Sequence, residues 1–287
     1  MFSLVLLKFH NYSGCDDSPK KESKTTTAKS SESIPGYELS EPRKIDLIKD
    51  LDEISGIAFY PKDTSVFAIN DQEGVLYKIY LNRSNKTSYW KFDQKHDFED
   101  LVLHDSAFYV LISNGNIDKL KYTKDTLSRK VASFSVGNGK INEFESLYFD
   151  DSSKQLVMIC NNCEADKKKS VSSFSVSTDS LLYKPGFYSI DVAPIIEKLN
   201  LEKIHLKPSA AAINPVTDDL YILAATNRLL VVTDRAGVVK NVYPLDPEVF
   251  RQPEALAFSP LGDMIIANEA GEGEAANLLI FKYQKEE

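Results

Sequence analysis

Apolar and polar residues alternate along most of the chain in short runs, which Gly, Asn, Asp and Pro residues bound. This alternation is typical of β-strands that face a core on one side. One pattern recurs: an apolar strand after a small or acidic residue, a second apolar strand with a polar end, and a third alternating strand. The five first strands begin at Ser55, Glu99, Glu145, Ser209 and Glu254, at spacings of 44, 46, 64 and 45 residues.

A period of about 20 to 50 residues predicts a repeat fold. Candidate fourth strands follow in four repeats, at 87–92, 129–136, 186–192 and 238–244, whereas the fifth repeat reaches the end of the chain after its third strand. A spare strand at 43–48 precedes the first repeat. We therefore predict an all-β fold, a β-propeller with five blades of four strands, in which the N-terminal strand completes the last blade and closes the ring.

The third spacing is the exception, because it is 64 residues long and contains a short helical pattern at 192–200. We interpret this segment as an insertion. A degenerate sixth blade is the alternative.

Composition narrows the class of protein. The 287 residues are 43% hydrophobic and 26% charged, which excludes a disordered or collagen-like chain. The net charge of −8 gives no electrostatic case for a nucleic-acid partner. Four His residues argue against a histidine-rich metal enzyme.

The N-terminus carries a different signal. An apolar run at 2–7, too short to span a bilayer, is followed by small residues before Cys15 and by a polar stretch. This order resembles a bacterial lipoprotein signal at 1–15, with a lipid attached to Cys15, a flexible linker at 16–37 and the propeller at 38–287. It predicts a cell-envelope protein anchored to a membrane on the periplasmic or surface side. The alternative is a cytoplasmic protein with a disordered tail, since no positive charge precedes the apolar run.

Equivalent positions of a propeller repeat form a ring, because the first strand of each blade lines the central channel. This places Ser55, Glu99, Glu145, Ser209 and Glu254 together. Side chains two residues apart in a strand point the same way. We therefore expect the channel mouth to include the acidic residues two positions earlier and the polar ends of the second strands: Glu53, Asp97, Glu143, Asp71, Asn114, Asn162, Asn227 and Glu269.

Like charges that face one channel are unfavourable unless they are protonated or neutralised by a cation. Carboxylate, amide and hydroxyl oxygens are hard ligands, which suit Ca²⁺ or Mg²⁺ better than Zn²⁺. The pattern predicts a calcium site formed by Glu99, Glu145, Glu254, Ser55 and Ser209. A solvated polar channel without metal is the alternative.

Several segments resemble the SdiA-regulated family of bacterial propeller proteins: Glu53–Phe59 with Phe67–Gly74, Asp97–Val102, and Gln252–Pro260 with Ile266–Ala270. The resemblance covers roughly residues 40 to 285, and related phytase-like and esterase-like propellers share the acidic repeat. It implies an exported or membrane-anchored, calcium-binding propeller with no settled activity. The chain departs from the family at Ser209, where the family has an acidic residue.

Two functions fit these observations. In the first, the protein is a binding or scaffold protein that presents one propeller face to a ligand or protein partner. In the second, a bound cation activates water against a phosphate ester or a lactone or other ester, with Glu53 or Asp71 as general base.

Cys160 and Cys163 form a Cys-x-x-Cys at a strand end, which allows either a disulfide or two free thiols.

Overall fold

A computed structural model describes residues 33–82, 86–123, 126–133, 142–164, 166 and 169–285, of which only the backbone is described at 122, 123, 126 and 127. The predicted signal segment with Cys15, and the linker as far as residue 32, lie outside these residues. None of the helices in the described part of the chain has the length and apolar character that a membrane span requires.

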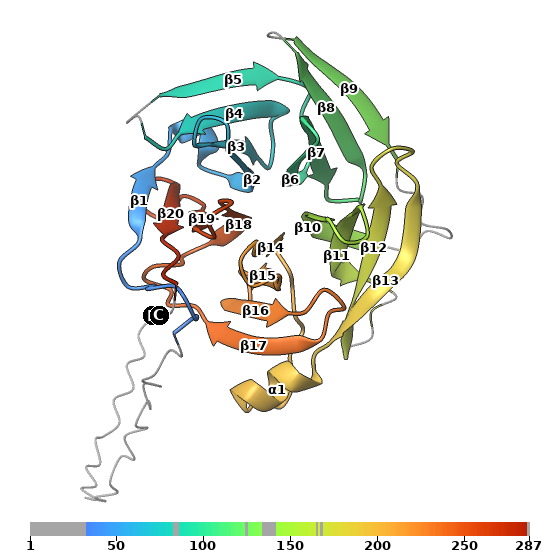
Figure 1. The fold of residues 1–287 in the computed structure, drawn as a ribbon, viewed down its shortest axis with the longest axis vertical. Coiled ribbons are helices and arrows are strands. Elements are labelled where there is room, and N and C mark those ends of the chain that lie inside the picture. The colour runs from blue at the N-terminus through green and yellow to red at the C-terminus, as the bar shows by residue number, and fades with distance from the viewer. Residues whose placement is uncertain are drawn as a thin grey trace, which may run out of the picture. The chain divides into compact units, whose positions relative to one another are not determined.

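Five sheets of four antiparallel strands form a ring around a central axis, as Figure 1 shows. The predicted five-bladed all-β propeller is therefore confirmed. From the axis outward, the blades consist of β2 (Ile54–Tyr60), β3 (Ser65–Asn70), β4 (Val75–Tyr80) and β5 (Thr87–Lys91); β6 (Phe98–His104), β7 (Ala107–Ile112), β8 (Ile117–Thr123) and β9 (Thr126–Ala132); β10 (Asn142–Asp150), β11 (Gln155–Cys163), β12 (Ser170–Ser177) and β13 (Tyr183–Asp191); β14 (Ala210–Ile213), β15 (Leu220–Ala224), β16 (Leu229–Thr233) and β17 (Val239–Pro244); and β18 (Pro253–Phe258), β19 (Met264–Asn268), β20 (Asn277–Phe281) and β1 (Arg43–Asp46).

The N-terminal strand closes the ring, as predicted. Strand β1 pairs with β20 in an antiparallel register that sets Arg43 opposite Ile280 and Ile45 opposite Leu278. A 3-10 helix, η1 (Lys49–Leu51), then leads the chain into blade 1. The pairing covers the edge of β20 and completes the fourth strand of the last blade.

The packed part of the chain begins before residue 38, where the linker was expected to end. Ile34 and Tyr37 are 1% and 4% exposed. The Tyr37 hydroxyl donates a hydrogen bond to the Gly262 carbonyl at 2.6 Å and accepts one from the Asn214 amide at 2.8 Å. These contacts fasten the segment before β1 to blades 4 and 5.

The long third spacing has two sources. One is α1 (Ala193–Leu199), the predicted insertion, which lies at the rim beside β17 (Figure 1). The other is the length of blade 3, whose strands have eight or nine residues each.

Two fourth strands begin three residues earlier than predicted: β9 starts at Thr126 rather than at 129, and β13 starts at Tyr183 rather than at 186. The hairpin pairing that extends them is invisible in apolar alternation alone.

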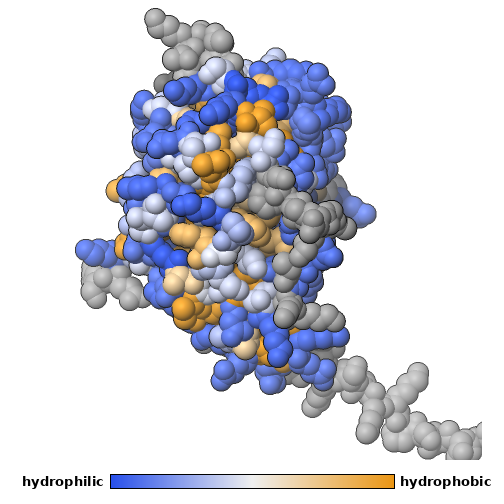
Figure 2. Space-filling model, turned by 90° about the vertical axis from the view of Figure 1, so that its right-hand side faces the viewer, coloured by the Kyte–Doolittle hydropathy of each residue, from blue (hydrophilic) through white to orange (hydrophobic). Residues whose placement is uncertain are grey.

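The core lies between neighbouring blades. Rings from adjacent blades meet edge to face or tilted, as between Phe67 and Phe108, whose centroids are 4.6 Å apart, and between Tyr221 and Phe258, at 5.2 Å. Full burial of one such side chain stabilises the fold by about 1.5–3 kcal/mol. On the outer surface beside β9 and β13, apolar side chains lie in separate spots among polar ones (Figure 2).

Candidate functional site

Four of the five ring positions lie at an irregularity of an innermost strand. In blade 1, Ile54 pairs with Asn70 and Gly56 pairs with Ile69, so Ser55 is an extra residue in a β-bulge. The same register shift leaves Glu99, Glu145 and Glu254 as extra residues in their blades. A bulge bends the strand and redirects a side chain. The repeated motif therefore encodes a repeated bulge, which the sequence pattern did not reveal.

Blade 4 carries Ser209 at this position, immediately before β14. The Ser209 N–H donates to the Leu223 carbonyl at 2.9 Å, which continues the pairing of β14 with β15. Its hydroxyl group also bonds to the neighbouring blade, at 3.3 Å from the Pro253 carbonyl.

Hydrogen bonds near these positions connect every blade to the next. The donor and acceptor pairs are Phe98 N–H to the Asp71 carbonyl (2.8 Å), Phe144 N–H to the Ser113 carbonyl (2.9 Å), the Asn161 side chain to the Pro208 carbonyl (3.3 Å), the Ser209 hydroxyl to the Pro253 carbonyl (3.3 Å), and Ala270 N–H to the Asp52 carbonyl (2.8 Å). Because these bonds encircle the axis, the strand ends that carry the ring residues are fixed relative to one another.

Asp100, which follows Glu99, links blade 2 to blade 3 from a fully buried position that no sequence motif marks. Its carboxyl oxygens accept hydrogen bonds from the Leu101 and Leu147 N–H groups, both at 2.7 Å. Burial raises the pKa of Asp100 well above its usual range, although these two bonds oppose the shift.

The ring side chains surround an axial cavity of about 230 Å³. Nine residues line it: Ser55, Asp71, Asp97, Glu99, Glu145, Ser209, Thr226, Glu254 and Glu269. The five predicted ring residues are thus brought together, with Asp71, Asp97 and Glu269 from the predicted mouth. Thr226 is an additional member at the end of β15.

Other predicted mouth residues lie outside this cavity. Glu53 is exposed, and Glu143 accepts a hydrogen bond from the Asn162 side chain at 2.9 Å, also on the exposed surface. Asn227 is engaged in the loop that contains His205 and Lys207. Asn114 is exposed as well.

The cavity disfavours negative charge. Burial, followed by the charges of Glu145 and Asp97, raises the pKa of Glu99 to about 9. Burial likewise raises the pKa of Glu145 to about 7 and that of Glu254 to about 7, although Lys207 opposes the first shift and a hydrogen bond from Ser209 opposes the second.

Two more carboxyl groups at this end of the channel behave in the same way. Burial and the charge of Glu254 raise the pKa of Glu269 to about 8. The pKa of Asp71 is raised by burial and by the charges of Glu53 and Asp97. The unliganded channel therefore holds protons near neutral pH.

The donor atoms fit a hard cation. The lining offers carboxylate and hydroxyl oxygens and neither a nitrogen nor a sulfur ligand. Moreover, Ser55 Oγ and Asp71 Oδ1 are buried and have no hydrogen-bond partner among the described residues. Buried polar atoms are normally satisfied, so these two oxygens are suited to face an ion or its water.

The width of the ring indicates how such an ion would be held. Among the described residues, no three of the cavity carboxylates have oxygens that all lie within 4.8 Å of one another. Contacts of about 2.4 Å to Ca²⁺, within its usual range of about 2.3–2.6 Å, would therefore not reach three carboxylates at once without side-chain rotation. The cavity instead suits an ion that keeps part of its water shell.

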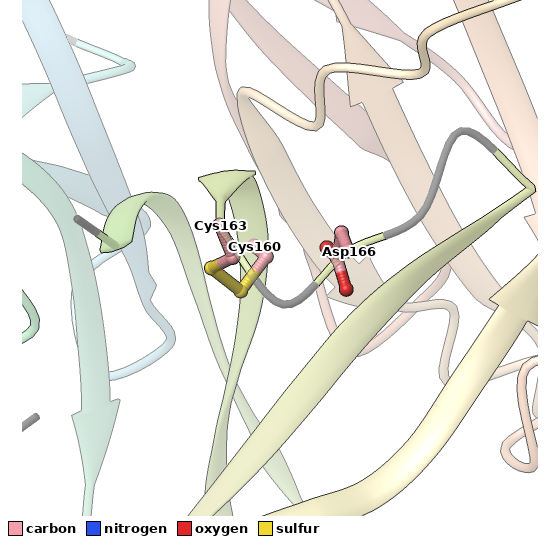
Figure 3. A group of neighbouring side chains, drawn as sticks. All are labelled: Cys160, Cys163 and Asp166. Atoms are coloured by element: carbon pink, nitrogen blue, oxygen red, sulfur yellow. A yellow bond between two sulfur atoms is a disulfide. The ribbon is translucent and has the colours of Figure 1, made fainter. Parts of the chain in front are cut away.

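Cys160 and Cys163 form a disulfide, with their Cα atoms 5.7 Å apart (Figure 3). This selects the disulfide from the two alternatives. The disulfide spans a second bulge, in β11 at Asn161, because Phe144 pairs with Cys160 while Glu143 pairs with Asn162. Asp166 lies beside it, but the bonded sulfurs are not thiolate ligands, and the Asp166 carboxylate accepts hydrogen bonds from the Ser172 N–H.

Comparisons with known proteins support the fold and leave the family open. No protein-family model matches the chain, and no curated protein matches it. Among solved structures, the chain is similar to the glutaminyl cyclase of Myxococcus xanthus (TM-score 0.58, 13% identity, covering 85% of this chain and 96% of that one). It is also similar to the PQQ-bound form of aldose sugar dehydrogenase from Streptomyces coelicolor (0.51, 9%, 85% and 99%) and to the calcium-binding protein regucalcin from Agrobacterium tumefaciens (0.48, 12%, 88% and 96%). At these identities, the likenesses to the cyclase and the dehydrogenase show the propeller fold alone.

Proposed function

We propose that this propeller binds a partly hydrated calcium ion in its axial cavity and acts as a binding or scaffold protein that presents the surrounding face to a ligand or partner. The observation that carries the proposal is the set of register shifts at Ser55, Glu99, Glu145 and Glu254, which recur in four blades and lie on one cavity. A solvated channel would not need the same redirected position in blade after blade.

The ion has a structural role in this proposal. Without it, ionised Glu99, Glu145 and Glu254 repel one another in a buried space. With it, the carboxylates of blades 2, 3 and 5 share one positive centre, directly or through water, and the ion joins the blades at the axis. A ligand that binds only the folded state also stabilises it by mass action.

Calcium titration of a Glu99→Gln variant tests the proposal. We expect the wild type to bind one Ca²⁺ per chain in calorimetry at pH 8, and Glu99→Gln to bind it about 10–100-fold more weakly, because a charged ligand with its partners is worth about 1.5–3 kcal/mol. In EDTA at pH 8, the same variant should melt at a higher temperature than the wild type, since it removes a carboxyl group whose burial in the folded protein costs free energy.

Glu143→Gln is the matched control, because Glu143 is an exposed glutamate outside the cavity on the same end of blade 3. It should change calcium affinity by less than about twofold and leave the melting temperature unchanged, because its charge acts on Glu145 more weakly than that of Glu254 does. Wild-type protein that binds no calcium, or a Glu99→Gln variant with wild-type affinity, would refute the axial site.

The cellular setting is a second part of the proposal. The lipoprotein-like segment at 1–15 and the resemblance to the SdiA-regulated family support an exported protein anchored through Cys15. The mass of the chain isolated from membranes tests this directly, and an unmodified residue 15 in that material would exclude the anchor. The predicted hydrolase remains a prediction, because no arrangement in the cavity favours it over ion binding.

A further inference from the structure

A second cavity lies beside the acidic channel, on blade 4. It is a groove of about 870 Å³ between the segment that follows α1, the turn after β15 and the end of β17. This volume falls in the range of about 300–1,000 Å³ that small-molecule sites occupy. Thr226 lines both the groove and the axial cavity, so the two are neighbours on the same end of the propeller.

The groove has an apolar floor. Leu229 and Leu245 are 5% and 4% exposed; Leu229 belongs to the core cluster that blade 4 shares with blade 3, and Leu245 to the one that it shares with blade 5. Leu199 and Ile204 are half-buried at its side, whereas Leu201 is 43% exposed. The groove therefore offers apolar surface that the folded chain itself leaves partly uncovered.

Hydrogen bonds fix its shape. The Asn227 side chain accepts a bond from the Lys207 N–H at 2.9 Å and donates one to the His205 carbonyl at 3.0 Å. On the other side, the Leu245 N–H donates to the Arg228 carbonyl at 2.9 Å. The walls are thus held in place before any ligand arrives, which lowers the entropic cost of binding.

The groove is lined by positive charges, whereas the chain as a whole has a net negative charge. Lys203, Lys207 and Arg228 line the groove, and the lining includes no acidic residue. In the described part of the chain, none of these three cations forms an ion pair. Three unpaired cations around an apolar floor, in a chain of net charge −8, form a local site for an anion.

We propose that this groove binds a small amphiphilic organic anion: a carboxylate whose apolar body lies on Leu229, Leu245 and Leu201 while its charged end meets Lys207 and Arg228. The occupant must carry both parts, since the apolar floor alone would accept a neutral compound and the cations alone would accept an inorganic anion. Binding in the groove does not require the calcium site, although the two cavities share Thr226 and the charge of Lys207 opposes the rise in the pKa of Glu145.

Titration with octanoate in EDTA tests it without any contribution from a channel ion. We expect saturable binding of one octanoate per chain, and at least about tenfold weaker binding of octanol, which has the same apolar body without the charge. The double variant Lys207→Gln/Arg228→Gln should bind octanoate at least about tenfold more weakly than the wild type. Lys184→Gln, at an exposed lysine of β13 outside the groove, should bind it as the wild type does.

A second variant distinguishes the loss of binding from the loss of the folded structure. Leu201→Glu changes an exposed groove residue, so it should fold normally and still reject octanoate by placing a like charge on the apolar wall. Octanol binding as tight as octanoate binding, or variants with unchanged affinity, would overturn the proposal. So would groove-dependent binding to phosphatidylglycerol vesicles in the absence of octanoate binding, because the face would then be a membrane contact.

Discussion

A chain that begins at Lys49 is expected to lose its cooperative thermal transition, or to melt at least about 15 °C lower than the full chain. Removing residues 1–48 exposes the edge of β20, which pairs with β1, and deletes Ile34 and Tyr37 from the core. Each buried side chain contributes about 1.5–3 kcal/mol, and four paired strand residues are lost as well. A total stability of about 5–15 kcal/mol leaves little after such a loss.

The control is a chain that begins at Ser33, which keeps β1 and the segment before it. Its melting curve, followed by circular dichroism, should match that of the full chain. If the chain that begins at Lys49 melted within about 3 °C of the full chain, closure by β1 would not be what holds the ring together.

The metal-free protein is expected to become less stable as the pH rises from about 6.5 to 9. Glu99, Glu145, Glu254 and Glu269 have pKa values of about 9, 7, 7 and 8 in the folded protein, against 4.5 for an unperturbed glutamate. Between these values and 4.5, the folded state binds more protons than the unfolded state, so the free energy of unfolding falls with rising pH. One unit in one pKa corresponds to about 1.4 kcal/mol. Over this range the four groups together account for about 6–7 kcal/mol, which should lower the melting temperature by at least about 10 °C.

Melting curves in EDTA measure this effect. The range starts at pH 6.5 because burial lowers the pKa of His104, so its titration below that point opposes part of the fall. Calcium should abolish the fall and release protons on binding near pH 7. The Glu99→Gln variant should show a shallower fall, and Glu143→Gln the wild-type fall. A melting temperature that stayed level or rose between pH 6.5 and 9 in EDTA would mean that the channel carboxyls do not share a buried space.

The blade count could be predicted from the sequence because each blade repeats one local pattern. Strands β2, β6, β10, β14 and β18 start from the same motif, and the spare strand at 43–48 matches the missing fourth strand of the last blade. The packing of Ile34 and Tyr37 could not be predicted, because two apolar residues in a polar stretch form no period. Tyr37 is held by Asn214 and Gly262, which are far away in the chain.

The axial cavity was predictable in its members and not in its geometry. Repeat position alone brought Ser55, Glu99, Glu145, Ser209 and Glu254 together. The inference that residues two apart point the same way assumed a regular strand, and the bulges interrupt that regularity. This is consistent with the positions of Glu53 and Glu143 outside the cavity. The groove on blade 4 had no sequence signal, because its walls come from three separate segments.

The most direct measurement is the anomalous difference density of a crystal grown with calcium and then soaked with terbium, a trivalent ion that takes similar oxygen ligands. The account predicts one strong peak on the propeller axis, among the side chains of Glu99, Glu145 and Glu254, with water molecules completing its coordination. Density for water alone at that place, with the strong peak on the outer surface of the blades, would contradict it.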